Sequence, residues 1–438
     1  SITINFNAVS DSDGYAIIAD LASYLNLLGN TVNYVGATAG NGMNNAVLLS
    51  NTDTAVIGNN KFNLTLVSAS VPWIEIPAGS YNWVQFPVSE GIVIDSSNAV
   101  GLIENDVYVT YGNVSGDYDT LYAVSAKNSD NTTIYGNNIT ALGHSYIYGM
   151  FISGNNFTVD SNKIAVESDN DYADGIDIDG PATGVVKGND IEITGVGSAY
   201  GIYSGMNGAE VSVNYTDNLV KASAYNVFGF SLGDVESHLE NNTIGLIGNY
   251  TTGIAYKGYY IDAKDNNLFL DSSEQGNLSF WESFGVETVG IKVLGGAAVI
   301  VNNTIATAGK GISLANSLTS GYLSGNFINV VANEDKNAYA IYADDLPYLY
   351  VISNDIDYQG ATNGTGINNA VYLNNANDAI ISNNKFDLEL VSSYVPWAEV
   401  PAGSGNWVSS PVSEGIVIDE SNGVVFDSNK VTVVLGNR

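Results

Sequence analysis

The densest group of carboxylates in the sequence lies in the stretch ESDNDYADGIDIDG, residues 167–180. If Ile176 and Ile178 point into a core, strand alternation sends Asp177 and Asp179 to the opposite face, about 7 Å apart. Two carboxylates can do general acid/base work, and oxygen ligands on rigid strands suit Ca²⁺. A solvated acidic wall is the alternative interpretation. The candidate calcium ligands are Asp169, Asp171, Asp174, Asp177 and Asp179.

The motifs that would accompany catalysis by this cluster are missing. Asp174-Gly-Ile-Asp177 is similar to the Asn-Thr-Asp-Gly-x-Asp stretch of polygalacturonases, but Tyr172 stands in place of the asparagine. The histidine motif Gly-His-Ser around His144 precedes the cluster, which is the wrong order, and His238 lies far away in the chain. A pectate lyase would need an arginine or lysine base beside calcium, yet the only arginine is Arg438. We therefore expect no catalytic residue.

Charge and composition exclude other classes of function. The chain has 46 acidic and 13 basic residues and a formal net charge of −33. Nucleic acid is excluded as a partner because phosphate binding needs clusters of lysine and arginine. An acidic surface suits high salt, divalent cations or cationic partners. Cysteine is absent, and no stretch of about 18 apolar residues indicates a membrane span.

A short repeat dominates the sequence and predicts the fold. In residues 47–64 the apolar residues form three pairs at spacing two, separated by small polar residues, and the same template recurs along the chain. Each pair has the period of a short strand with one buried face. We predict an all-β, right-handed parallel β-helix of about 14 coils. The units end on Asn30, Asn60, Asn105, Asn137, Asn162, Asn189, Asn218, Asn242, Asn266, Asn303, Asn326, Asn354, Asn384 and Asn429.

The recurring asparagine has a structural explanation. Asparagine tolerates the left-handed backbone that a sharp corner needs, and stacked amides hydrogen-bond from coil to coil. Ligand binding is the alternative role. We expect a structural ladder.

Runs such as GIVIDSSNAVGLIENDVYV (91–109) and NAVYLNNANDAIISNNKFDL (369–388) carry a resemblance to a known family. They resemble the parallel β-helix repeats of the NosD-like group, especially the Asn-rich adhesin-like and surface-layer proteins of methanogenic archaea. The resemblance covers nearly the whole chain. It implies a secreted cell-envelope protein with structural or adhesive duties and no cofactor.

The glycosylation sequons also indicate an extracellular location at the cell surface. Asn-x-Ser/Thr motifs are acceptors for glycosylation, which takes place outside the cytoplasm. The candidates are Asn63, Asn113, Asn131, Asn138, Asn156, Asn214, Asn241, Asn249, Asn277, Asn302 and Asn363.

A long repeat of 324 residues stands above the short one. Residues 325–438 repeat the start of residues 1–324 without a gap, so we expect one continuous β-helix over 1–438, cut from a longer protein. Proline-rich insertions at 69–89 and 394–413 should leave the coil as flaps. Tryptophans in the three longest coils either pack against the rod or contact a partner or glycan: Trp73, Trp83, Trp281, Trp397 and Trp407.

These observations together predict an extracellular structural protein, as a surface layer, sheath, fibre or adhesin-like stalk. We expect self-association end to end or side by side, because open strand edges favour further pairing. The alternatives are a polysaccharide lyase or hydrolase, or a glycan-binding adhesin without catalysis.

Overall fold

A computed structural model shows that the chain is all β, with no helix among the residues it describes. The chain divides into two compact units, Ser1–Tyr225 and Asn226–Arg438. The structure describes residues 1–8, 14–36, 44–66, 74–75, 83–84, 89–111, 120–144, 146–205, 210–272, 288–315, 318–332, 337–360, 369–390, 398–399, 407–408 and 414–435.

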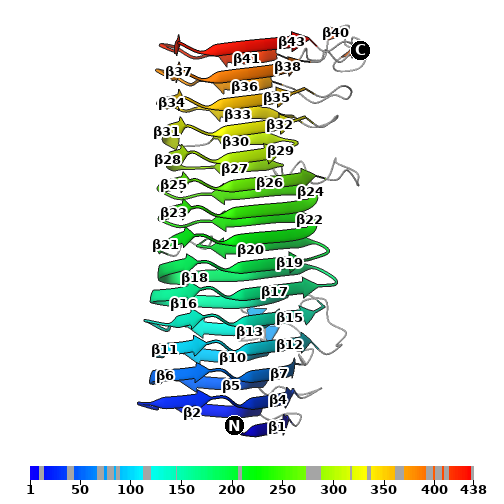
Figure 1. The fold of residues 1–438 in the computed structure, drawn as a ribbon, viewed down its shortest axis with the longest axis vertical. Coiled ribbons are helices and arrows are strands. Elements are labelled where there is room, and N and C mark those ends of the chain that lie inside the picture. The colour runs from blue at the N-terminus through cyan, green and yellow to red at the C-terminus, as the bar shows by residue number, and fades with distance from the viewer. Residues whose placement is uncertain are drawn as a thin grey trace. The chain divides into compact units, whose positions relative to one another are not determined.

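The first unit is built from short strands that follow one another around successive coils (Figure 1). Its strands are β1 (Thr3–Asn7), β2 (Gly14–Asp20), β3 (Leu25–Leu28), β4 (Thr31–Val35), β5 (Asn44–Ser50), β6 (Asp53–Gly58), β7 (Lys61–Leu66), β8 (Ile74–Glu75), β9 (Trp83–Val84), β10 (Ser89–Asp95), β11 (Asn98–Ile103), β12 (Asp106–Tyr111), β13 (Thr120–Lys127), β14 (Thr133–Tyr135), β15 (Asn138–Gly143), β16 (Tyr146–Asp160), β17 (Lys163–Ser168), β18 (Tyr172–Lys187), β19 (Asp190–Thr194), β20 (Ser198–Ser204), β21 (Val211–Thr216) and the start of β22 (Leu219–Leu232).

The second unit repeats this plan. Its strands after β22 are β23 (Glu236–Glu240), β24 (Thr243–Tyr256), β25 (Tyr260–Lys264), β26 (Asn267–Ser272), β27 (Val289–Val293), β28 (Gly296–Val301), β29 (Thr304–Thr307), β30 (Lys310–Leu314), β31 (Leu318–Ser324), β32 (Phe327–Val331), β33 (Tyr339–Asp344), β34 (Leu349–Ile352), β35 (Asp355–Gln359), β36 (Asn369–Asn374), β37 (Ile380–Ser382), β38 (Lys385–Leu390), β39 (Ala398–Glu399), β40 (Trp407–Val408), β41 (Glu414–Asp419), β42 (Val425–Asp427) and β43 (Lys430–Leu435).

The pairing between coils is parallel and keeps apolar residues in columns. Strand β7 pairs with β4 and β12, which aligns Phe62 with Val32 and Val107. All three side chains are buried. Such columns form the core of each unit and confirm the predicted parallel β-solenoid. The solenoid has about 11 turns, slightly fewer than the sequence repeat predicts.

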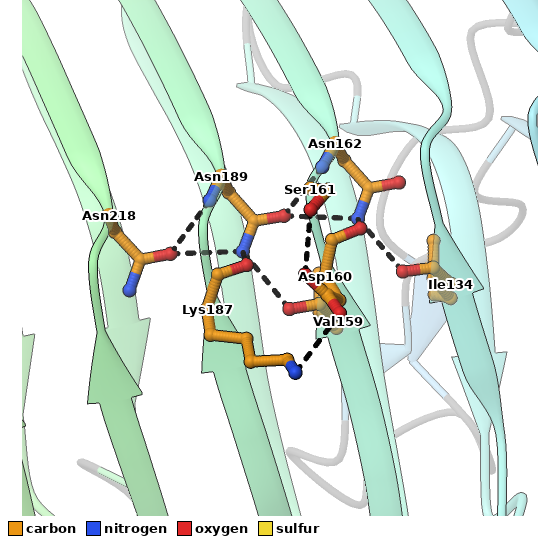
Figure 2. A network of polar contacts seen from close by, with 8 residues as sticks. All are labelled: Ile134, Val159, Asp160, Ser161, Asn162, Lys187, Asn189 and Asn218. Carbon is orange, nitrogen blue, oxygen red and sulfur yellow. Dashed lines mark hydrogen bonds and ion pairs between the residues drawn. The ribbon is translucent and has the colours of Figure 1, made fainter.

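The predicted asparagine ladder is present in both units. Figure 2 shows one stretch of it: the Asn189 Oδ1 accepts hydrogen bonds from the Asn162 backbone N–H and Nδ2, both at 3.0 Å. The Asn162 Nδ2 also donates to the Ile134 carbonyl at 2.9 Å. Twelve of the fourteen ladder asparagines are buried. Each buried amide replaces its lost water by hydrogen bonds to the neighbouring coils, as burial of a polar group requires.

The predicted reason for asparagine at the corner was wrong in one respect. None of the ladder asparagines has a positive φ; the residue immediately before each one does, with φ between 53° and 66°. The ladder asparagine therefore supplies the amide, and its predecessor supplies the left-handed turn. These predecessors are Gly29, Asn59, Glu104, Gly136, Ser161, Gly188, Asp217, Asn241, Asp265, Asn302, Gly325, Ser353, Asn383 and Ser428.

Two short hairpins lie in the proline-rich insertions. Strand β8 pairs antiparallel with β9, and β39 pairs antiparallel with β40, each pair forming a sheet apart from the solenoid. That the whole insertions form flaps stays a prediction.

Candidate functional site

The candidate site lies on strand β18, where the sequence predicts an acidic cluster. Ile176 and Ile178 are fully buried, as expected for core residues. Asp174 is only 6% exposed and Asp177 only 9%. These two carboxylates are therefore buried groups, and the alternative of a solvated wall does not hold for them.

A glycine between these aspartates interrupts the simple alternation of the strand. A Cβ on Gly175 would lie 2.5 Å from the Gly201 carbonyl oxygen, so the backbone packs closely against the next coil here. Strict alternation would place Asp174 on the same side as Ile176. Instead Asp174 lies close enough to Asp177 for their charges to interact.

Aromatic residues lie on both neighbouring coils, in register with the two carboxylates. Asp174 pairs with Tyr148 of β16 and Tyr200 of β20. Asp177 pairs with Phe151 of β16 and with Tyr203 of β20. The Tyr200 and Tyr203 rings contact edge to face, with centroids 5.6 Å apart. Each carboxylate is thus layered between two aromatic side chains, which are themselves half-buried.

This environment disfavours the ionised carboxylates. Burial, with a further contribution from Asp177, raises the pKa of Asp174 well above its ordinary value. Burial and the charge of Asp179 raise the pKa of Asp177 to about 7. Burial also raises the pKa of Tyr148, as do the charges of Asp174 and other neighbours. The Oδ1 atoms of Asp174 and Asp177 accept no hydrogen bond. A group of this kind can hold a proton near neutral pH or bind a positively charged ligand.

On the preceding coils, a lysine lies beside a buried carboxylate and aromatic rings, the same kinds of group that surround Asp174 and Asp177. Glu90 of β10 is in register with Tyr122 of β13, and Tyr122 with Tyr148. The Lys127 Nζ forms an ion pair with the buried Glu90 carboxylate. It also lies 5.6 Å from the centroid of the Tyr122 ring and 6.0 Å from that of Phe151. This part of the wall binds an ammonium group between a carboxylate and aromatic faces.

The other three predicted calcium ligands have different surroundings. Asp169 is exposed, and its Oδ1 lies 2.6 Å from the His144 Nδ1. Burial raises the pKa of Asp171, although a hydrogen bond with Tyr146 opposes the shift. The Asp179 Oδ1 accepts a hydrogen bond from the backbone of the next residue, Gly180.

Among the residues that the structure describes, no three or more His, Cys, Asp or Glu side chains are arranged to hold a metal ion. The five aspartates, all described, therefore do not form the expected coordination shell. Calcium binding stays a prediction. His238 contacts Glu236 and Asp262, so the two histidines are not brought together as ligands of one ion.

The tryptophan predictions fall mostly outside the described part of the chain. Trp73, Trp281 and Trp397 lie outside the described residues, and Trp83 and Trp407 are described only as parts of strands β9 and β40. A role in partner or glycan contact stays a prediction for all five.

Most of the described sequons are at the surface. Asn131, Asn138, Asn156, Asn214, Asn241 and Asn302 are exposed, whereas Asn63 and Asn249 are half-buried. Asn113, Asn277 and Asn363 lie outside the described residues. The Asn63 Nδ2 donates a hydrogen bond to the Asn33 Oδ1 at 2.7 Å, so the atom that would carry a glycan is already in use.

The aromatic part of the site was not predicted from the sequence. A signal was present, because Tyr148-Gly, Asp174-Gly and Tyr200-Gly share one spacing relative to the apolar residue that follows. Aligning the coils on this glycine would have placed the aspartate between the two tyrosines.

No family model matches the chain, and no curated protein is similar to it. The described residues contain no helix that is long and apolar enough to cross a membrane. The structure supports the resemblance to NosD-like repeats only in the parallel solenoid fold, and membership of that family stays a prediction.

Proposed function

We propose that the chain is an extracellular structural protein of a cell envelope, serving as part of a surface layer, sheath, fibre or adhesin-like stalk. The observation that carries this proposal is that the ladder amides are hydrogen-bonded to the coils on both sides. The Asn105 Oδ1 accepts two hydrogen bonds from Asn60, and its Nδ2 donates to Asn137 and to the Ile57 carbonyl. Such saturation makes a stiff scaffold that needs no ligand to hold it together.

Assembly is the direct test of this proposal. Electron microscopy of the native cell surface and of the purified protein should show a lattice or filament whose subunits react with an antibody to this chain. Self-association, end to end or lateral, is part of the proposal. Isolated particles in both preparations would contradict it.

Glycosylation tests the extracellular location separately. Asn214 is exposed, whereas Asn63 is half-buried with its Nδ2 engaged. Glycopeptide mapping of the native protein should find a glycan on Asn214 and an unmodified Asn63. A native protein without glycan at any sequon would remove this line of support.

A second candidate function, action on a polysaccharide, is favoured by the buried carboxyl pair alone. A carboxyl group that stays protonated near neutral pH is suited to act as a general acid beside a second carboxylate. Release of reducing ends or unsaturated products from acidic polysaccharides, lost in Asp177→Asn, would support catalysis. A glycan array would identify the adhesin alternative.

A further inference from the structure

The buried aspartates of β18 lack a cationic partner. Asp174 and Asp177 have no ion pair with any residue in the described part of the chain, and the Oδ1 atom of each accepts no hydrogen bond. A buried carboxylate without a cationic partner is disfavoured, and a bound cation would remove this cost by stabilising the ionised form. The pair is therefore set up to gain from a positive charge delivered to it.

The same wall shows which kind of positive charge fits. The Lys127 ammonium sits against the Glu90 carboxylate and the rings of Tyr122 and Phe151. In the second unit, the Lys310 Nζ lies 4.4 Å from the centroid of the Tyr342 ring. Around Asp174 and Asp177 the carboxylates and aromatic rings are both present. No described lysine forms an ion pair with either of these two carboxylates.

We propose that Asp174 and Asp177, together with the rings of Tyr148 and Tyr203, bind an organic ammonium group such as that of an alkylamine or an amino sugar. The ammonium donates hydrogen bonds to the two Oδ1 atoms. Its carbon-bonded flank packs against the aromatic faces, where cation–π attraction adds to the ion pair. The Oδ1 atoms are buried and the rings are half-buried, so the ammonium reaches the carboxyl groups, charged end first, when the rings move aside.

The chemistry of the site favours an organic cation over a divalent metal ion. Calcium takes six to eight oxygen ligands, whereas this site offers two carboxylates flanked by aromatic carbon. The absence of any metal-holding group among the described residues agrees with this choice.

Isothermal titration calorimetry at constant ionic strength tests the proposal. The probes are n-butylammonium chloride, glucosamine hydrochloride, uncharged N-acetylglucosamine and CaCl₂. The variants are the double substitution Asp174→Asn/Asp177→Asn and, as a matched control, Asp53→Asn on strand β6, where the aspartate is exposed. We expect saturable binding of both ammonium probes to the wild type and to Asp53→Asn, weakened about ten- to a hundredfold in the double variant. N-acetylglucosamine should not bind.

The outcomes separate the sources of the ligand. Tighter binding of glucosamine identifies an amino sugar, and tighter binding of butylammonium identifies an amine or lysine-like side chain. If the double variant does not fold by circular dichroism, Tyr203→Leu provides the test, with about two- to tenfold weaker ammonium binding expected from loss of one aromatic face. The proposal is overturned by absence of saturable ammonium binding, by unchanged affinity in the folded variants, by equal binding of N-acetylglucosamine, or by CaCl₂ occupying the same residues.

Discussion

Among single residues, the ladder asparagines stand out because a short, uncharged side chain carries an amide that both accepts and donates hydrogen bonds. The amide offers an acceptor and two donors on one short, neutral group, so one residue can bond to the coils on both sides. Aspartate would lose the donors and bring a buried charge, and glutamine would be longer. This is why the sequence alone identifies the ladder so well.

Replacing a ladder asparagine should therefore be costly. Asn105→Ala removes donors to Asn137 and Ile57 and leaves the Asn60 amide groups without their acceptor. We expect the free energy of unfolding to fall by about 3 kcal/mol, because buried partners are left unsatisfied. Urea unfolding measures this.

The matched control is Asn138→Ala, which removes a solvent-exposed hydrogen bond to the Asp106 Oδ1. We expect a loss below about 0.5 kcal/mol, since water replaces the lost bond. Equal losses in the two variants would show that the ladder contributes no more than a surface contact.

A second prediction concerns how the aspartates of β18 make the stability of the fold depend on pH. The folded-state pKa of Asp177, about 7, lies above its ordinary value of 3.8, so the folded protein binds more protons than the unfolded chain between these two values. Stability from this group is present below pH 3.8 and is lost as the pH rises through about 7. Asp174 acts in the same direction. Tyr148, Tyr200, Tyr203 and Asp179 also surround the pair.

The measurement is thermal or urea unfolding from pH 4 to pH 8. Wild type and Asp53→Asn should lose stability across this range, by about 2 to 4 kcal/mol from Asp177. In Asp177→Asn the slope should be smaller, because an amide does not titrate. A slope in Asp177→Asn equal to that of the wild type would contradict a raised pKa for this carboxyl group.

At the scale of elements, close contact between coils limits which residues fit a strand. A Cβ on Gly290 of β27 would lie 2.5 Å from the Gly311 carbonyl oxygen and 2.5 Å from the Ile305 Cγ2. Gly245 of β24 is a strand glycine with nothing within 4 Å of that position. The two glycines therefore have different roles in the same unit.

Alanine substitutions should separate these roles. Gly290→Ala should lower the free energy of unfolding by about 2 kcal/mol, since the coils must move apart to fit the methyl group. Gly245→Ala should be neutral or raise it by about 0.5 kcal/mol through the less flexible unfolded chain. Thermal unfolding of both variants measures the difference. Similar effects at the two sites would show that the coils tolerate a methyl group at Gly290.

These strands also show which features of the fold and of the candidate site can be predicted from the sequence. Apolar pairs at spacing two predict the strands, because one buried face is enough to impose that period on residues such as Val47 and Leu49. The association of Asp174 with Asp177 was not predictable by alternation, since it depends on the close contact at Gly175. The aromatic neighbours could be predicted only from the register between coils. This register is hard to read from the sequence because the repeat units differ in length.

At the scale of the whole molecule, charge opposes compaction. The formal net charge of −33 is held by a chain with only 13 basic residues, so most carboxylates have no lysine to pair with. Their mutual repulsion acts over about 30 Å at 0.01 M salt and about 8 Å at 0.15 M. Folding brings these charges together and therefore loses stability most when the salt concentration is low.

The melting temperature should accordingly rise steeply between 0.01 and 0.15 M NaCl and then more slowly up to 1 M. The initial rise reflects screening, since the Debye length shortens most in that range. Sucrose at matched osmolality provides the control, because it stabilises by exclusion without screening charge. Differential scanning calorimetry at fixed pH measures both series. A melting temperature that is constant or falls over the first interval would mean that the carboxylates are neutralised within the fold, by protons or by bound cations.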